Sequence, residues 1–394
     1  MFQFVSKFNP TKLTLNLLIA LLLIACQHAD SQTLTTLYSF PELANPFGVV
    51  IDSQNNIYGT TDGNFCASRP KVAGTAFELA TSGTFTELHS FPCGGAAEDP
   101  EGLILDPSDN LYGFTAGGAD YASEVYELQA PHHIKFDVLF NSHGNTQVHS
   151  PRGITRDLGG NLYIATNGGT GDSGTIFEIS SAGNSVIHNF AGPPSDGSLP
   201  ENIIYGGGNL YGITHAGGAY NIGTAYELSL SGTETMLYSF CSQFPACPDG
   251  QGPSGELALD GQGNMYGVAV YGGNTNSDCD AGCGVVFKVT SSGQQSVLHS
   301  FTGGTDGQYP LGVVMDANEN LYGTTYFGGV NNCGIVYELT AASGYTSKLL
   351  LYSFTGASDG CTPSALAIDA EGNLYGTTTY DGGHGYGTVF KLTP

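Results

Sequence analysis

The segment GNLYGTTTYDGGHGYGTVFKLTP, residues 372–394, contains two short apolar stretches that are separated by a glycine-rich loop. Its Asn-Leu-Tyr-Gly tetrapeptide recurs along the chain with small variations. The Asn of these copies stands at positions 56, 110, 161, 209, 264, 320 and 373. Copies spaced 48 to 56 residues apart indicate one structural unit that is repeated seven times.

Each repeat contains up to four apolar segments of four to seven residues. In the first repeat the tetrapeptide lies between GVVID (48–52) and GTAFEL (74–79), and LHSF (88–91) follows. Clusters of Gly, Asn, Asp and Ser separate the segments, as is typical of strands and turns. We name the four strands A, B, C and D in chain order. Four short strands per repeat predict an all-β, seven-bladed β-propeller of four-stranded blades.

The last repeat lacks a strand D, because its strand C ends at Leu392, close to the end of the sequence. A matching segment, LTTLYSF (34–40), instead precedes the first strand A. An unpaired strand edge promotes aggregation, and closing a ring of sheets removes such edges. We therefore expect residues 34–40 to pair with residues 387–393 and to complete the last blade.

The beginning of the chain differs from the repeats. Two lysines precede the apolar segment LTLNLLIALLLIA (13–25), which is shorter than a comfortable membrane span and resembles a secretory signal. LIAC (23–26) resembles a bacterial lipobox, which would place a lipid on Cys26. The alternative is an ordinary signal peptide with a free or disulfide-bonded Cys26. We predict a lipoprotein signal peptide (1–25), a short tether (26–33) and a propeller (34–394).

The chain carries 10 basic and 35 acidic residues, for a net charge of −25. This charge argues against a nucleic-acid partner and against a polybasic membrane contact. The acidity is interpreted as a solubility feature, with bound divalent cations as the alternative. Asp-Gly pairs between strands D and A could place carboxylates for calcium, but Asp-Gly also favours turns. We expect turns and no cofactor, with calcium as the alternative; the Asp residues are Asp196, Asp249, Asp306 and Asp359.

Eight cysteines follow the lipobox, an even number that suits disulfides in an oxidising compartment. Cys66 and Cys93 lie in the loops after strands B and D of blade 1, and Cys333 and Cys361 lie in the same two loops of blade 6. Because these loops should emerge on one face of a blade, we predict the pairs Cys66–Cys93 and Cys333–Cys361. For the other four we prefer the local pairs, with cross-loop pairing as the alternative; these pairs are Cys241–Cys247 and Cys279–Cys283. Zinc fits their spacing poorly.

The repeats resemble a known family. The motifs Leu-Tyr-Gly-Thr-Thr, Gly-Gly, Gly-Thr-Val-Phe-Lys-Leu and Leu-His-Ser-Phe resemble the GloVer tandem repeats of bacterial exported proteins, over roughly residues 34–394. The portion from strand A to strand B is more loosely similar to NHL-type propeller repeats. The resemblance implies an exported or surface-held β-repeat protein, and it supplies no catalytic residues. Repeats 2 to 4 depart most from the pattern.

Two residues are candidates for a ligand contact. Arg156 occupies a position in strand A that is apolar in other repeats, so its charge must be paired or reach water in the channel. A structural salt bridge and a ligand contact are the two interpretations. His215 lies near a strand end and is the second candidate. We assign no catalytic residue and no metal site.

We predict a monomeric, lipid-anchored β-propeller of the bacterial cell envelope, either an outer-membrane lipoprotein or a cell-surface protein. It would bind an unidentified extracellular ligand or envelope component, or serve as a scaffold, because binding residues often lie on loops of a rigid fold. The alternative is an extracellular hydrolase or lyase acting on polysaccharide at the channel mouth, and a third possibility is a structural surface-layer component. Fold alone does not decide. We expect an enzyme to show an unrepeated polar cluster on blades 2 to 4, and a scaffold to show only repeated polar positions; we favour a non-enzymatic role.

Overall fold

The structure is a computed structural model that describes residues 32–41, 44–63, 72–94, 98–117, 122–131, 133 and 135–394. The predicted signal peptide, Cys26 and all but the last two residues of the predicted tether lie outside the described residues. The predicted all-β class is confirmed. Besides strands, turns and loops, the described ranges contain only three short 3-10 segments: Thr170–Asp172, Gly304–Asp306 and Ala341–Ser343. No helix in these ranges has the length and hydrophobicity to cross a membrane.

Four consecutive stretches of the chain each form a four-stranded antiparallel sheet with strands in sequence order. The first two sheets contain β2 (Pro46–Ile51), β3 (Ile57–Asp62), β4 (Val72–Leu79) and β5 (Phe85–Pro92), then β6 (Glu98–Leu105), β7 (Leu111–Gly117), β8 (Glu124–Gln129) and β9 (Lys135–Asn141). The next two contain β10 (Pro151–Arg156), β11 (Leu162–Thr166), β12 (Thr175–Ile179) and β13 (Ser185–Asn189), then β14 (Gly197–Gly206), β15 (Asn209–Gly217), β16 (Thr224–Ser229) and β17 (Glu234–Ser239). The four strands correspond to the predicted A to D.

An eight-stranded sheet follows, in which two antiparallel groups of four are joined by their first strands. The junction is a single parallel residue pair, Glu256 with Gly312. The first group contains β18 (Gln251–Leu259), β19 (Met265–Tyr271), β20 (Val285–Val289) and β21 (Gln295–Ser300). The second contains β22 (Gln308–Met315), β23 (Leu321–Phe327), β24 (Ile335–Leu339) and β25 (Lys348–Ser353).

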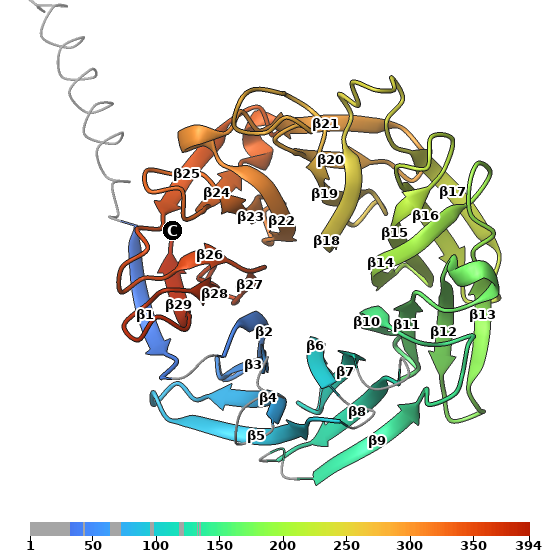
Figure 1. Ribbon diagram of the computed structural model, residues 1–394, viewed down its shortest axis with the longest axis horizontal. Helices are drawn as coiled ribbons and strands as arrows, with labels where there is room; N and C mark the ends of the chain where they lie inside the picture. Colours follow the sequence, from blue (N-terminus) through green and yellow to red (C-terminus); the bar gives the residue numbers. More distant parts are fainter. Residues whose placement is uncertain are drawn as a thin grey trace, which may run out of the picture.

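The last sheet combines the two ends of the described chain. It contains β1 (Thr33–Ser39), β26 (Cys361–Pro363), β27 (Ala367–Ile368), β28 (Leu374–Tyr380) and β29 (Thr388–Thr393). β1 lies antiparallel to β29, with Thr33 opposite Thr393 and Ser39 opposite Thr388. Figure 1 shows the strand groups following one another around a common centre, with β1 beside β29. This arrangement is propeller-like.

The turn between strands A and B is built by one aspartate. Asp52 accepts hydrogen bonds from the backbone N–H and the side-chain amide of Asn56, and from the hydroxyl of Tyr58. The same three bonds recur in five other repeats, at Asp106, Asp157, Asp260, Asp316 and Asp369. The Asp and Asn of the repeat are therefore turn residues.

Apolar side chains fill the space between neighbouring strand groups. Seven clusters of buried residues occur in the described part of the chain, and each draws on two adjacent groups. One of them joins Val389 of β29 to Phe77 of β4. An aromatic residue of strand C contributes to each cluster: Phe77, Tyr126, Phe177, Tyr226, Phe287, Tyr337 and Phe390. The hydrophobic core is therefore divided among the contacts between groups.

Two of the three described disulfides each close one loop, and the third links the loop after β23 to the start of β26. The structure contains the pairs Cys241–Cys247, Cys279–Cys283 and Cys333–Cys361, which are the preferred pairs. Cys93 is also disulfide-bonded, but its predicted partner, Cys66, lies outside the described residues.

Candidate functional site

A cavity of about 560 Å³ lies where the first strands of the groups converge. Its walls come from β2, β6, β10, β14, β18 and the segment around β27. Phe47, Leu103 and Ile104 are among its apolar lining residues. The volume is within the range of small-molecule sites, which are mostly apolar with a few polar groups.

Strand A places a variable residue at this cavity. Every strand A has a proline near its start, and the residue after that proline differs between repeats: Phe47, Glu101, Arg152, Glu201, Ser254, Leu311 and Ser364. The pairing between strands A and B is interrupted by a register shift close to this position in six repeats. Such bulges redirect side chains. In five repeats this position lines the cavity, at Phe47, Glu101, Arg152, Glu201 and Ser254.

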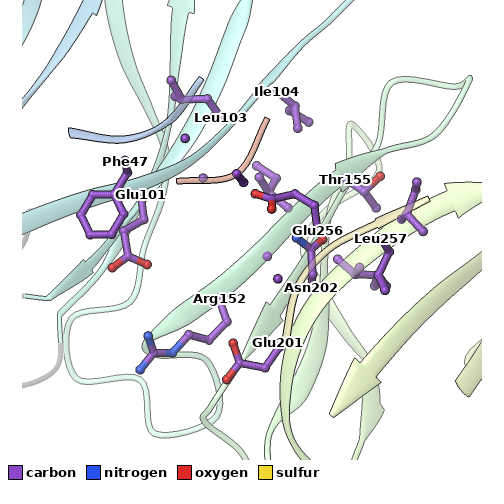
Figure 2. A pocket seen from close by; sticks show the side chains of 18 of the residues that line it. Phe47, Glu101, Leu103, Ile104, Arg152, Thr155, Glu201, Asn202, Glu256 and Leu257 are labelled. Carbon is purple, nitrogen blue, oxygen red and sulfur yellow. The ribbon is translucent and has the colours of Figure 1, made fainter. Parts of the chain in front are cut away.

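Four charged residues gather at the cavity: Glu101 of β6, Arg152 of β10, Glu201 of β14 and Glu256 of β18. Figure 2 shows them around the same space. The segment from Pro253 to Asp260 is one residue longer than the corresponding segment in other repeats, such as Pro310 to Asp316. In this longer segment, Glu256 lies beside Gly312 of the next group.

These charges have few partners within the protein. Arg152 is exposed and forms no ion pair within 4 Å and no side-chain hydrogen bond with the described residues, and the same holds for Glu101 and Glu201. Glu256 is bonded by its own backbone N–H. All four groups are therefore available to a ligand.

Burial raises the pKa of the carboxyl groups. It raises the pKa of Glu101 to about 7, where the charges of Asp99 and Asp62 add to the effect and Arg152 opposes it. Burial also raises the pKa of Glu256 to about 7, against the hydrogen bond from its own backbone. The pKa of Glu201 is raised by burial as well, although the charge of Arg152 opposes this. Removal from water disfavours the charged form of a carboxyl group, and this raises its pKa.

An acidic pair, Asp62 and Asp99, lies close to Glu101. Burial raises the pKa of Asp62 to about 6, and both the charge of Asp99 and a hydrogen bond between the two side chains add to the effect. The pair belongs to two neighbouring groups, since Asp62 ends β3 and Asp99 lies in β6. This region therefore concentrates negative charge on one side of the cavity.

The arrangement allows two kinds of chemistry. Carboxylates and a guanidinium together can bind a ligand that carries both donors and acceptors. A carboxyl group with a pKa near 7 can also donate or accept a proton at neutral pH. Perturbed carboxyl groups in a cavity are typical of functional sites, although structural networks can shift a pKa as well.

The two predicted ligand residues occupy different places. Arg156 lies at the far end of β10, and it does not line the cavity. Its buried Nε atom has no hydrogen-bond partner among the described residues, and its charge acts on Asp106 and Tyr112 of the neighbouring group. His215 is exposed on β15 against Gly252, and its charge acts on Glu201. His215 is therefore near the charged cluster, whereas Arg156 is separate from it.

The four charged residues of the cavity are not predicted from the sequence. A comparison of the residue after the strand A proline would have identified three of them, because Glu101, Arg152 and Glu201 are charged there whereas the other four repeats have uncharged residues. Glu256 has no such indication, since its strand is one residue longer.

The sequence profile described as the Gloeobacter/Verrucomicrobia repeat matches residues 116–279 and 274–394. This match agrees with the resemblance of the repeats. Among curated proteins, none matches the chain in sequence.

Solved structures with a similar fold include a streptogramin B lyase, at a TM-score of 0.63 and 16% identity, covering 92% of this chain and 97% of that one. Virginiamycin B lyase from Staphylococcus aureus has a TM-score of 0.62 and 16% identity, covering 92% and 99%. The extracellular domain of a hybrid two-component system from B. thetaiotaomicron has a TM-score of 0.56 and 12% identity, covering 91% of this chain and 39% of that one. Identities this low show a shared fold.

Proposed function

The chain belongs to the Gloeobacter/Verrucomicrobia repeat family, and we propose that it is a ligand-binding β-propeller of the bacterial cell envelope. The propeller would have seven blades, over residues 34–394, with β1 completing the last one. Support comes from the seven clusters between strand groups and from the pairing of β1 with β29. Residues 1–25 would be removed on export, and a lipid on Cys26 would hold the protein through the tether (26–33).

The charged cluster of the cavity carries this proposal. A scaffold built from repeats needs only polar residues that occur in every repeat, but a charge after the strand A proline is confined to Glu101, Arg152 and Glu201. They lie on three consecutive first strands, in repeats 2 to 4. Glu101 and Glu201 are partly buried and lack ion-pair partners among the described residues, which costs stability, so their retention beside Arg152 points to a ligand.

The proposed ligand is rich in hydroxyl groups, as glycans are. A hydroxyl group donates to a carboxylate and accepts from a guanidinium, so a polyol matches the sequence of Glu101, Arg152 and Glu201 around the cavity. Phe47, which is 38% exposed, offers an apolar surface for the face of a sugar ring. Glycans are also constituents of the envelope in which the protein would reside.

A thermal-shift screen of the purified protein against envelope glycans tests the proposal. We expect at least one glycan to raise the melting temperature, and we expect Arg152→Gln and Glu201→Gln to abolish the increase. Glu319→Gln is the control, because Glu319 is an exposed glutamate in a turn away from the cavity. A shift that survives both cavity substitutions would place the ligand elsewhere.

An extracellular hydrolase or lyase acting on polysaccharide is the second candidate. The observation that favours it is the pKa of about 7 at both Glu101 and Glu256, which suits a general acid and a general base. Incubation with polysaccharides, followed by assays for new reducing ends and for unsaturated products, distinguishes the two. Product that disappears in Glu101→Gln and persists in Glu319→Gln would favour catalysis, and binding without product would favour the binding module.

A further inference from the structure

Three side chains with metal-binding atoms meet away from the cavity, at the contact between two neighbouring groups. They are His188 in β13, Asp196 in the loop before β14, and Glu234 in β17. One ligand atom of each lies within 4.8 Å of the other two. The His188 Nε2 and Glu234 Oε2 atoms are 3.0 Å apart, and the two side chains are only 14% and 12% exposed. Figure 1 shows β13 and β17 on the outer side of the ring of strands.

The same contact is built differently in the repeats that follow. The strand register places Tyr238 and His299 at the position of His188. The Tyr238 hydroxyl donates a hydrogen bond to Asp249, and His299 contacts Asp306 at 3.2 Å. In those two contacts, the aspartate of the loop between strands D and A accepts a hydrogen bond from the Tyr or His side chain of strand D.

Strand D of the following group supplies the third side chain of each contact. By register, Gln295 and Lys348 stand where Glu234 stands. Lys348 forms an ion pair with Asp306, and the Gln295 amide donates to the Asp249 carbonyl. Glu234 instead adds a second carboxylate beside Asp196. This contact therefore has two acids and an imidazole where its counterpart has one acid, one imidazole and a lysine.

The atoms that face one another have no other partners. Apart from its ion-pair contact with Glu234 Oε2, the buried Nε2 of His188 has no hydrogen-bond partner among the described residues, and the buried Oε1 of Glu234 has none. Asp196 is held by the backbone N–H groups of Ala191 and Gly197, both at 2.6 Å. Outer hydrogen bonds of this kind orient the ligands of metal sites.

We propose that His188 Nε2 and the carboxylates of Asp196 and Glu234 bind a zinc ion. An imidazole with two carboxylates suits zinc, whereas calcium prefers oxygen ligands alone. Zinc–ligand bonds of about 2.0–2.1 Å in a tetrahedron separate the ligand atoms by roughly 3.4 Å, against 3.0 Å between His188 Nε2 and Glu234 Oε2 and at most 4.8 Å for the other two pairs. Water would take the fourth position. The ion supplies the positive charge that Lys348 supplies in the corresponding contact, and it links the group of β10–β13 to the group of β14–β17.

Zinc chloride titrated into the oxidised, tag-free protein, in competition with a chromophoric chelator, tests this site. We expect one zinc ion per chain that competes with the chelator, and a higher melting temperature with zinc. His188→Gln should lose both effects. Glu234→Lys should also lose both, and it should remain folded without zinc because it reproduces the contact made by His299, Asp306 and Lys348.

The matched control is His299→Gln, which removes the corresponding histidine from the contact that already holds a lysine. It should bind zinc as the unmodified protein does. Equal zinc binding by the unmodified protein and by Glu234→Lys would overturn the assignment. So would an absence of zinc binding by the unmodified protein, or an equal loss in His299→Gln.

Discussion

The glycine of Leu-Tyr-Gly is required because an aromatic ring of strand C lies against it. A Cβ atom at Gly323 would approach the Tyr337 hydroxyl oxygen to 2.4 Å and the Gly312 carbonyl oxygen to 2.6 Å. Both distances are shorter than any real Cβ contact. Repeat 3 is the exception, since Ile164 stands at this position opposite Phe177 and is buried there. The glycine is thus conserved within the chain by packing rather than by a turn.

Gly323→Ala should lower the free energy of unfolding by about 1–3 kcal/mol, because the added methyl group overpacks a contact that includes backbone. Gly261→Ala is the control, since nothing lies within 4 Å of the Cβ it would add. Denaturant unfolding of both variants measures the difference. Equal stability of the two variants would contradict the packing explanation.

Glu256 should make stability depend on pH. Its pKa in the folded protein is about 7, against an ordinary value of 4.5, so between these values the folded state binds more protons than the unfolded state. Stability contributed by the protonated carboxyl is therefore complete below about pH 4.5 and is lost as the pH rises through about 7.

Glu256→Gln should gain stability relative to the unmodified protein as the pH rises from 4.5 to 8, by up to about 3 kcal/mol. Parallel urea unfolding at both pH values measures this difference, with Glu319→Gln as the control that keeps the original pH dependence. A constant difference between Glu256→Gln and the unmodified protein would show that Glu256 titrates normally.

Residues that serve the repeat could be predicted from the sequence, whereas those that serve the cavity require a comparison of the position after the strand A proline across the repeats, and Glu256 is not found even by that comparison. Asp52 and its counterparts recur with their Asn and Tyr partners, so their role in turns follows from the pattern. Arg156 is conspicuous in the sequence because it replaces an apolar residue, whereas Arg152 is not, because its position varies among the repeats. The physical reason is the bulge in strand A, which turns that position toward the channel and has no sequence signature of its own.

At the scale of elements, strand counting was sufficient to place β1. The repeat pattern predicts pairing of residues 34–40 with residues 387–393, and the structure pairs Thr33–Ser39 with Thr388–Thr393. Register within a repeat was harder to predict. DVLF (137–140) in repeat 2 resembles LHSF (88–91) in repeat 1, which would align Phe140 with Phe91, but Phe140 lies opposite Val125 as His89 lies opposite Ala76. Side chains of a strand alternate between its two faces with a period of two. A shift of two residues therefore leaves each side chain on the same face, and the apolar pattern does not reveal it.

Deleting residues 34–40 should expose the edge of β29 and part of the cluster around Phe77. We expect a lower melting temperature and self-association, because an unpaired edge strand promotes pairing with other chains. Size-exclusion chromatography with light scattering measures the association. Deleting residues 27–31, which precede β1, is the control. A truncated protein that remains monomeric and equally stable would show that β1 does not complete the sheet.

At the scale of the molecule, the predicted lipid at Cys26 decides where the protein resides. Several acyl chains anchor a protein stably, whereas one chain binds weakly. Cys26→Ser should therefore move the protein from the membrane fraction to the soluble fraction without changing its melting temperature. Fractionation followed by immunoblotting measures this shift, and an unchanged membrane fraction would show that the anchor is not at Cys26.

The pairing of β1 with β29 also has a consequence for the order of folding. Thr33 and Thr393 are 360 positions apart, and the entropy of bringing such distant segments together is recovered only after the intervening groups have packed. The contact should then be the last to form and the first to open. Native-state hydrogen exchange would report this as a local opening of β1 at a lower free energy than global unfolding. An exported chain that emerges with its first strand would have to keep that strand unpaired until the whole array has followed it.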